Sequence, residues 1–139
     1  MWRRHHAELA CDPDKAPLAP KWNDYFDLDL LGALQILTVR DGSLLVGYIF
    51  NVIGGHRHKQ STKFATLDMY WVDPGYRTGF LGLKLFRENE RILKAAGVQK
   101  ILAEEKMHFK NKFGRQVSIL FKRLGYTPEA IVHGKWIGD

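Results

Sequence analysis

A buried strand, a glycine-containing turn and a long amphipathic helix constrain the fold of this chain most. Lys63–Val72 is apolar on both faces, which is typical of a covered strand, and Pro74 ends it because proline cannot donate a ladder hydrogen bond. From Gly79 to Ala96 the apolar residues recur with a helical period, and Gly97 is typical of a left-handed helix stop. The segment Val98–Ala103 then returns as a parallel strand through a right-handed crossover. An α/β chain is therefore predicted.

Two strands precede this unit. Leu34–Val39 and Leu44–Ile53 are apolar, and the Asp-Gly pair between them is typical of a tight hairpin. The other expected segments are irregular residues 1–20, a short helix (Trp22–Leu34), a polar loop (56–62), a second helix (Gly114–Leu124) and one or two closing strands (Gly125–Ile137).

The composition indicates one globular domain that spans residues 1–139. No apolar run approaches the roughly 20 residues needed to cross a bilayer, and the arginines near the N-terminus are not followed by the apolar segment of a secretory signal. A single cysteine, Cys11, cannot form an internal disulfide and favours the cytoplasm. The net charge of +6 favours an anionic partner, which leaves nucleic acid, an acidic surface or a small polyphosphate as alternatives.

The turn before the long helix carries no acid. A helix start exposes unpaired N–H groups and about half a positive charge, which Asp, Ser or Asn usually caps. Here Thr78 is the only candidate cap, and Arg77 stands beside it, so an external anion is favoured. The alternative is a plain turn whose glycines ease the bend. The P-loop and dinucleotide glycine patterns are both absent, which favours a pyrophosphate site of another type.

The strand, the V-x-P-x-Y-R sequence of Val72–Arg77, the glycine loop and the helix ending in Gly-Val together resemble the acetyl-CoA motif of the GCN5-related N-acetyltransferases. The resemblance covers roughly Gly32–Ile137. The chain is most similar to small acetyltransferases often encoded by bacteriophages, through T-x-R-D-G, L-V-G-Y, two histidines after the second strand and a final R-L-G-Y. This resemblance implies a mixed, mostly antiparallel sheet with helices on both faces and a splayed parallel pair at the cofactor site.

The resemblance also implies acetyl-CoA as cofactor and transfer of its acetyl group to a primary amine. The backbone of Tyr70, Trp71 and Val72 would pair with pantetheine and the acetyl group, and Asn111, with Lys110, would contact pantetheine or the adenosine phosphate unless it caps the second helix. The residues implied to hold the pyrophosphate are Arg77, Thr78, Gly79, Phe80, Leu81 and Gly82. Arg77 and Gly82 match the ends of the family's loop, but Phe80 takes the position of its middle glycine.

Asp68 is the candidate general base, because it lies in an apolar strand where burial would favour the protonated form. A structural ion pair is the alternative, and Glu104 and Glu105 are second choices. Relatives often carry a tyrosine where this chain has Phe121, which cannot donate a proton. Tyr126 is therefore the candidate acid, although its family position usually serves packing, and water is the alternative donor.

The remaining polar and aromatic candidates leave more than one interpretation open. His56 and His58 have no third zinc ligand in view, so no metal is predicted, and both are expected to be solvated or to line the acceptor entrance. His5 and His6 are expected to be disordered. Another group either borders the acceptor pocket or packs in the core: Trp22, Tyr25 and Phe26.

The acceptor is expected to be a small molecule or a protein amine, in the host cytoplasm if the protein is phage-encoded. Nucleic acid is less favoured, a membrane partner is not expected, and a homodimer is among the alternatives for assembly. The competing function is a module of the same fold that binds CoA or nucleic acid without turnover.

Overall fold

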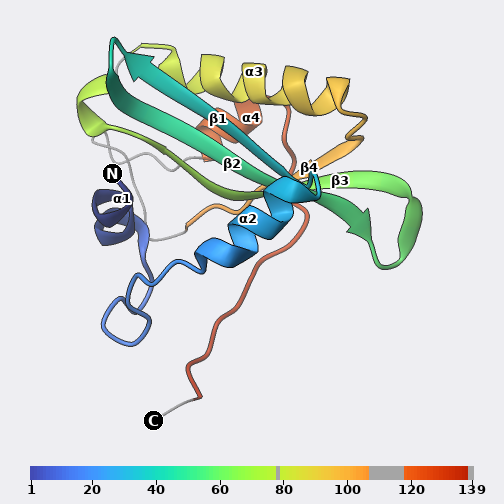
Figure 1. The fold of residues 1–139 in the computed structure, drawn as a ribbon, viewed down its shortest axis with the longest axis horizontal. Coiled ribbons are helices and arrows are strands. Elements are labelled where there is room, and N and C mark those ends of the chain that lie inside the picture. The colour runs from blue at the N-terminus through green and yellow to red at the C-terminus, as the bar shows by residue number, and fades with distance from the viewer. Residues whose placement is uncertain (78, 107–117, 138–139) are drawn as a thin grey trace.

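The computed structural model describes residues 1–77, 79–106 and 118–137. Its elements, in chain order, are α1 (Trp2–Leu9), α2 (Trp22–Leu30), β1 (Leu34–Asp41), β2 (Leu44–His56), β3 (Lys59–Val72), the 3-10 helix η1 (Pro74–Tyr76), α3 (Leu81–Ala95), β4 (Lys100–Leu102) and α4 (Ser118–Arg123). Figure 1 shows how they are arranged around one sheet.

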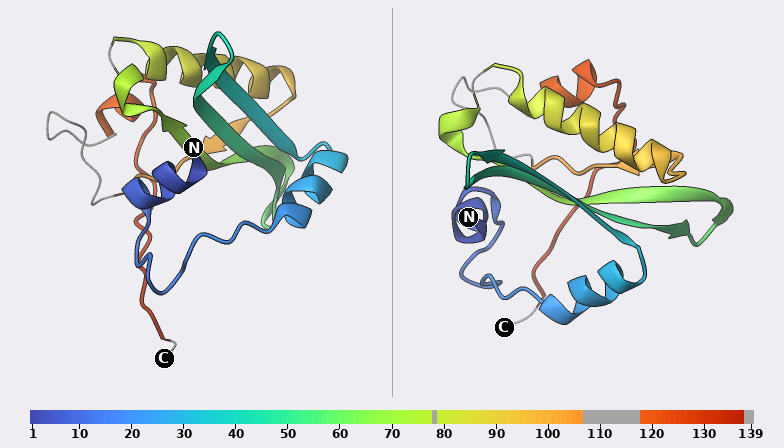
Figure 2. Two further views of the ribbon diagram at one scale, coloured as in Figure 1. Left: turned by 60° about the vertical axis from the view of Figure 1, so that its left-hand side comes forward. Right: turned by 45° about the horizontal axis from the view of Figure 1, so that its top comes forward.

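The sheet has the strand order β1-β2-β3-β4 among the described residues. The first three strands are antiparallel, and β4 pairs with β3 in parallel. Helices α3 and α4 lie on one side of the sheet, while α1 and α2 lie on the other (Figures 1 and 2). The predicted mixed, mostly antiparallel sheet with helices on both faces is therefore confirmed. No helix in the described part of the chain is both long and apolar enough to cross a membrane.

Helix α3 packs on the sheet through a stripe of helically spaced residues. Leu85, Phe86 and Leu93 are almost fully buried, as the apolar periodicity predicted. Ala96, which we expected on the same face, is exposed because the helix ends one residue before it. The stripe also contains Asn89, which the sequence pattern did not single out and which is fully buried.

Asn89 belongs to a chain of amides between α3 and the sheet. The Nδ2 group of Asn51 donates to Asn89 Oδ1 at 2.7 Å and to Gln35 Oε1 at 2.5 Å. Buried amides are tolerated when they are hydrogen-bonded, and each such bond also restricts how the two elements can shift. The amides therefore fix the position of α3 against β2.

The β1–β2 hairpin turns where the sequence predicted, and the β2–β3 hairpin has a shorter turn than predicted. The β1–β2 turn has Gly42 at φ +57°, in agreement with the Asp-Gly signal. The polar segment 56–62 was predicted as a loop, but β2 and β3 extend into it and leave a two-residue turn at 57–58. Strand pairing here satisfies the backbone groups that a loop would leave to water.

The two ends of the chain differ from the expectation. Residues 2–9 form α1, so only part of the predicted irregular segment 1–20 is irregular. The closing strands expected in 125–137 are absent, since 127–137 has neither helix nor strand. The second predicted helix is present from Ser118, and its expected first residues, 114–117, lie outside the described residues.

Candidate functional site

The site begins where β3 and β4 separate. The two strands pair over three residues only, and the last pair joins Thr66 to Leu102. Beyond this pair, β3 continues to Val72 with β2 as its only paired strand in the described part of the chain. Such an edge can accept an external extended partner through its backbone groups. The splay that we expected is therefore present, and residues 70–72 lie along it.

The side chains at this edge point to opposite sides of the sheet. On the α3 side, the ring of Tyr70 packs edge-on against the rings of Phe86 and Phe121. The ring centroids are 5.2 Å and 6.1 Å apart, respectively. Burial raises the pKa of the Tyr70 phenol, so the hydroxyl stays protonated at neutral pH. The indole of Trp71 is buried on the other side, where its Nε1 donates to Glu8 of α1 at 2.7 Å.

In the turn from β3 to α3, no side chain of the described residues caps the helix start. The Asp73 carboxylate accepts from the Gly75 N–H at 3.0 Å, so it caps η1 and not α3. Gly79 has φ +73°, a conformation that favours glycine. Helix α3 then starts at Leu81, after Phe80, with no side-chain cap and no acid in its first turn. The start of α3 therefore carries the partial positive charge of a helix N-terminus, and no described acid or capping side chain offsets it in the first turn.

Gly82 lies in the first turn of α3, and internal packing does not require a glycine there. Among the described residues, a Cβ at this position would meet only Leu120 Cδ2, at the ordinary contact distance of 3.8 Å. Since glycine lowers helix stability by up to about 1 kcal/mol relative to alanine, its use here points to a closely approaching partner. Three further residues named for the cofactor lie outside the described residues: Thr78, Lys110 and Asn111.

Arg77 is bound to the N-terminal helix. Its two terminal nitrogens donate to the Glu8 carboxylate, the NH2 group at 2.7 Å, and its Nε donates to the Val72 carbonyl at 2.7 Å. The guanidinium also lies over the Trp71 ring, 5.6 Å from its centroid. We expected this charge to face an external anion, whereas the structure pairs it with a carboxylate of the same chain.

Glu8 is ionised in this arrangement. Burial alone raises the pKa of its carboxyl group, but the hydrogen bonds from Arg77 and Trp71 outweigh burial and lower the pKa overall. The contact between α1 and the turn is therefore a charge-assisted pair, which is stronger than a neutral hydrogen bond.

Asp68 is not buried as we expected. Between β2 and β3 the register shifts, so that Phe50 faces Met69 while Asn51 faces Leu67. Asp68 is consequently the extra residue of a β-bulge, and a bulge re-aims its side chain. The carboxylate is exposed and accepts a 2.7 Å hydrogen bond from the Tyr25 hydroxyl of α2, not from an Arg or Lys.

The second-choice carboxylates follow β4 and differ in their surroundings. Glu104 is exposed. Glu105 accepts from the backbone N–H of Ser118 at 2.7 Å, at the first residue of α4. Glu105 therefore stabilises the start of a helix, and Glu104 faces solvent, as we expected of one of the pair.

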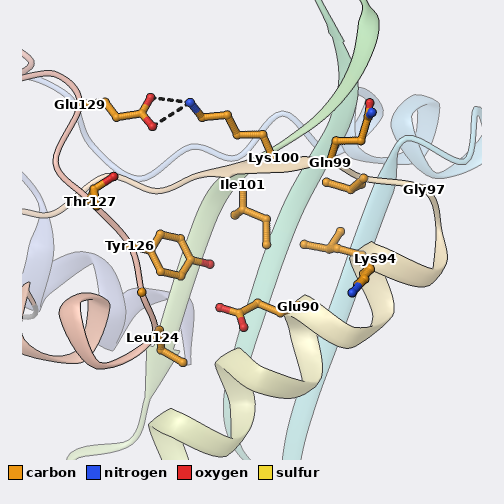
Figure 3. Close-up of a pocket in the computed structure, with 13 residues that line it drawn as sticks. Glu90, Lys94, Gly97, Gln99, Lys100, Ile101, Leu124, Tyr126, Thr127 and Glu129 are labelled. Carbon is orange, nitrogen blue, oxygen red and sulfur yellow. Dashed lines mark hydrogen bonds and ion pairs between the residues drawn. The ribbon is translucent and has the colours of Figure 1, made fainter.

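The aromatic residues considered for the proton donor, Phe121 and Tyr126, lie on the α3 side of the sheet, and Phe121 also contacts Tyr70 and Phe86. Phe121 is buried in the core, and the ring of Tyr126 packs on it at 5.3 Å. The Tyr126 hydroxyl is buried, has no hydrogen-bond partner among the described residues, and points toward the Glu90 carboxylate across a hollow (Figure 3). Burial, and then Glu90, raise the pKa of Tyr126. Glu90 lies nine residues after Leu81, which is about 13 Å along the helix axis.

Sequence reasoning missed an aromatic cluster between the N-terminal helices and the sheet. Trp2 stacks on Trp22 at 5.0 Å and meets Phe50 edge-on at 6.0 Å. His5, expected to be disordered, hydrogen-bonds through Nδ1 to the Tyr48 hydroxyl at 2.7 Å. Burial lowers the pKa of His5 to about 4, so its ring is neutral at pH 7.

One signal could have found this cluster. Trp2, His5 and Glu8 are spaced three apart, which places them on one face of a helix. Two aromatic residues of α2 differ in their surroundings. The ring centroids of Tyr25 and Phe50 are 6.2 Å apart, whereas the Phe26 side chain is 62% exposed to solvent.

His56 and His58 lie at the β2–β3 turn, with ring centroids 5.6 Å apart. The backbone N–H of His58 donates to His56 Nδ1 at 3.2 Å. Within the described ranges, no cluster of three or more His, Cys, Asp or Glu side chains could hold a metal ion.

Comparison with known proteins gives no match to any protein-family model and none to a curated protein sequence. Solved structures do match. An aminoglycoside acetyltransferase from an uncultured soil metagenomic sample is 12% identical, with a TM-score of 0.70 over 91% of this chain and 80% of that one. The glucosamine-6-phosphate N-acetyltransferase of Arabidopsis thaliana is 13% identical, with a TM-score of 0.67 over 84% of this chain and 76% of that one.

A third match was solved with a ligand that contains CoA. It is AAC(6')-Iy in complex with the bisubstrate analogue CoA-S-monomethyl-acetylneamine, 15% identical, with a TM-score of 0.66 over 99% of this chain and 90% of that one. The chain therefore has the fold of these acetyltransferases. At such identities the likeness concerns the fold alone.

Proposed function

We propose that this chain is an acetyl-CoA-dependent N-acetyltransferase of the GCN5-related type, which transfers an acetyl group to a primary amine. One observation carries the proposal: the start of α3, which no side chain of the described residues caps, closely follows the open edge of β3 along the chain. The shared fold with acetyltransferases supports it. The closer likeness to small bacteriophage enzymes rests on sequence motifs alone.

The residues at the turn fit a diphosphate group. The amides of Gly79, Phe80, Leu81 and Gly82 surround a helix start that carries partial positive charge and has no acid in its first turn to repel an anion. The edge of β3 at residues 70–72 offers backbone groups to an extended pantetheine arm. Bound acetyl-CoA would supply an activated acetyl thioester at this edge.

The acceptor amine must lose a proton before it attacks. A lysine-like amine has a pKa near 10.4, so holding it neutral at pH 7 costs about 4–5 kcal/mol. Asp68 is the proposed proton acceptor, directly or through water, because its exposed carboxylate can reach an amine in solvent. Tyr25 orients this carboxylate through its 2.7 Å hydrogen bond. The C–N bond would form as the C–S bond breaks. The attacking nitrogen would release its second proton to solvent, and the thiolate would take a proton from Tyr126 or from water.

A binding module without turnover is the second candidate. The observation in its favour is Phe121, which is buried where relatives often carry a proton-donating tyrosine. Such a module would retain the α3 site and lack acetyl transfer.

Titration with acetyl-CoA, followed by measurement of thiol release with a panel of amines, separates these candidates. The panel should include an aminoglycoside, an amino sugar phosphate and a lysine peptide. We expect binding and CoA release with at least one amine. Binding without release for any amine would favour the module, and absence of binding would contradict both.

A further inference from the structure

Helix α1 depends on the rest of the protein for its structure. It has eight residues, no side-chain cap at its first turn and no fully buried residue. Helices shorter than about 12 residues are marginal in water by themselves. Its face formed by Trp2, His5 and Glu8 must therefore be held by contacts with the sheet.

Apart from the hydrogen bond between His5 and Tyr48 of β2, the polar contacts given for α1 side chains converge on the end of β3 and the turn that leads to α3. Glu8 accepts from both terminal nitrogens of Arg77 and from the Trp71 indole. Arg4 donates to the Asp73 carboxylate at 2.7 Å and lies over the Trp71 ring at 5.4 Å. Two of these partners, Trp71 and Arg77, are residues named above for the cofactor, and Asp73 lies between them in the chain.

The segment that follows α1, residues 11–20, is compatible with movement of α1 away from the sheet. Residues 11–20 have neither helix nor strand and are exposed except for Pro20. Extended chain spans up to about 3.3–3.6 Å per residue, so this segment is long enough for α1 to leave the sheet without pulling on α2. Movement would break the Arg4–Asp73 and Glu8–Arg77 ion pairs and would uncover the buried rings of Tyr48 and Trp71, which His5 contacts.

We propose that α1 is a displaceable strap: the Glu8 carboxylate holds Arg77 in the free protein, and a phosphate group of CoA replaces it in the complex. This inference rests on the proposed function. A phosphate offers the same bidentate geometry to a guanidinium as a carboxylate and carries more negative charge. The N-terminal helix and the cofactor then compete for one arginine.

Because of this competition, the apparent Kd for CoA equals the intrinsic Kd divided by the fraction of molecules in which the strap is open. Glu8→Gln keeps the side-chain shape and an acceptor for Trp71 but removes the charge that holds Arg77. We expect this variant to bind CoA about five- to tenfold more tightly than the wild type. Glu88→Gln is the matched control, because Glu88 forms its 2.7 Å ion pair with Arg91 on α3 and loses the same charge.

Two measurements on the full chain test the strap. Calorimetric titration gives the Kd for CoA. Hydrogen exchange without ligand gives the exchange rates of the amides in residues 2–9, which report how readily α1 opens. Faster exchange with tighter CoA binding in Glu8→Gln, and neither change in Glu88→Gln, supports the inference. Faster exchange with weaker binding would mean that Glu8 supports the arginine for the cofactor, and it would overturn the competition.

Failure of the proposed function gives a different pattern. If neither wild type nor Glu8→Gln binds CoA, the transferase proposal fails. The competition for Arg77 is then decided with inorganic pyrophosphate: faster exchange of the α1 amides on its addition supports the strap, and unchanged exchange overturns it. Unchanged ligand-free exchange in Glu8→Gln would also overturn it.

Discussion

At the scale of single residues, Gly82 and Asp68 have local geometries on which the proposed function depends. Gly82 leaves the first turn of α3 accessible, although a Cβ would fit there. Asp68 is turned outward by a one-residue bulge, toward the hydroxyl of Tyr25. Neither feature improves the internal packing of the fold, so each is best tested by changing the residue and following binding or turnover.

We expect Gly82→Asp to abolish CoA binding without loss of fold stability. A carboxylate at the start of a helix is favourable by about 0.3–1 kcal/mol, but it would repel a phosphate at the same amides. Calorimetric titration and thermal unfolding measure the two effects. Gly134→Asp is the control, since it adds the same charge in the tail with no atom within 4 Å of its Cβ. Retained affinity in Gly82→Asp would place the phosphate elsewhere.

Asp68→Asn should lower kcat about 100-fold or more, because general-base catalysis contributes about 10²–10⁴ in rate. The Kd for acetyl-CoA should change less than twofold, since this carboxylate lies on the α2 side of the sheet. Tyr25→Phe keeps the carboxylate and should cause a smaller loss. Steady-state kinetics across pH test this role. If Asp68→Asn has the same kcat as the wild type at every pH, Asp68 is not the general base.

At the scale of elements, the strongly periodic segments were predictable and the short or irregular ones were not. Strands β1 to β3 and helix α3 follow from local patterns of apolar residues. Helix α1 was missed because eight residues carry too little local signal, and its stability comes from partners far along the chain such as Tyr48 and Arg77. The bulge at Asp68 was missed because strand register depends on the partner strand.

The amide chain between α3 and the sheet gives a stability prediction. Asn89→Ala should destabilise the fold by about 1–3 kcal/mol, because it removes one of the two acceptors of the buried Asn51 amide and leaves only Gln35. The double variant Asn51→Leu, Asn89→Leu should be closer to the wild type, since neither group is then left unpaired. Urea unfolding measures both, and a single variant as stable as the wild type would show that the amide pair does not fix α3.

The docking of α1 should weaken as pH falls. The pKa of His5 in the folded chain, about 4, lies below its unfolded value near 6.5, so its contribution is complete above pH 6.5 and is lost toward pH 4. The pKa of Glu8 is also lowered, so its contribution to docking is lost as pH falls further. Around His5, burial has the largest effect on the pKa, the Glu8 carboxylate raises it, and Arg77 and His6 lower it. Opening of α1 should increase up to about tenfold per pH unit in this range.

Tryptophan fluorescence follows this opening because Trp2 lies in the aromatic cluster. His5→Gln should flatten the pH dependence between 6.5 and 4. A transition of the same size in His5→Gln would assign the pH dependence to another group.

At the scale of the whole molecule, the fold separates two environments around one sheet edge. The α3 side carries the aliphatic and aromatic core, and the α1–α2 side carries the polar strap, Asp68 and exposed aromatic rings. A cofactor bound at the edge of β3 would therefore meet an acceptor that approaches from the α1–α2 side. The net charge of +6 favours anionic ligands in general and does not select CoA over nucleic acid.

The order of elements around the edge was predictable because a strand, a turn and a helix adjacent in sequence are also adjacent in space. The pairing of Arg77 with Glu8 was not, because it joins residues 69 positions apart. The C-terminal segment was likewise predicted to form strands, but it forms none, and its side chains Ile131, Val132 and Ile137 are exposed. A strand forms only where a partner edge is available.

The most direct test follows the backbone amide resonances of the whole chain during titration with acetyl-CoA. We predict saturable shifts that are largest at Gly79, Leu81 and Gly82 and at the β3 edge, residues 70–72. Shifts confined to the hollow beside Tyr126, or no saturable shifts at all, would contradict cofactor binding at the start of α3.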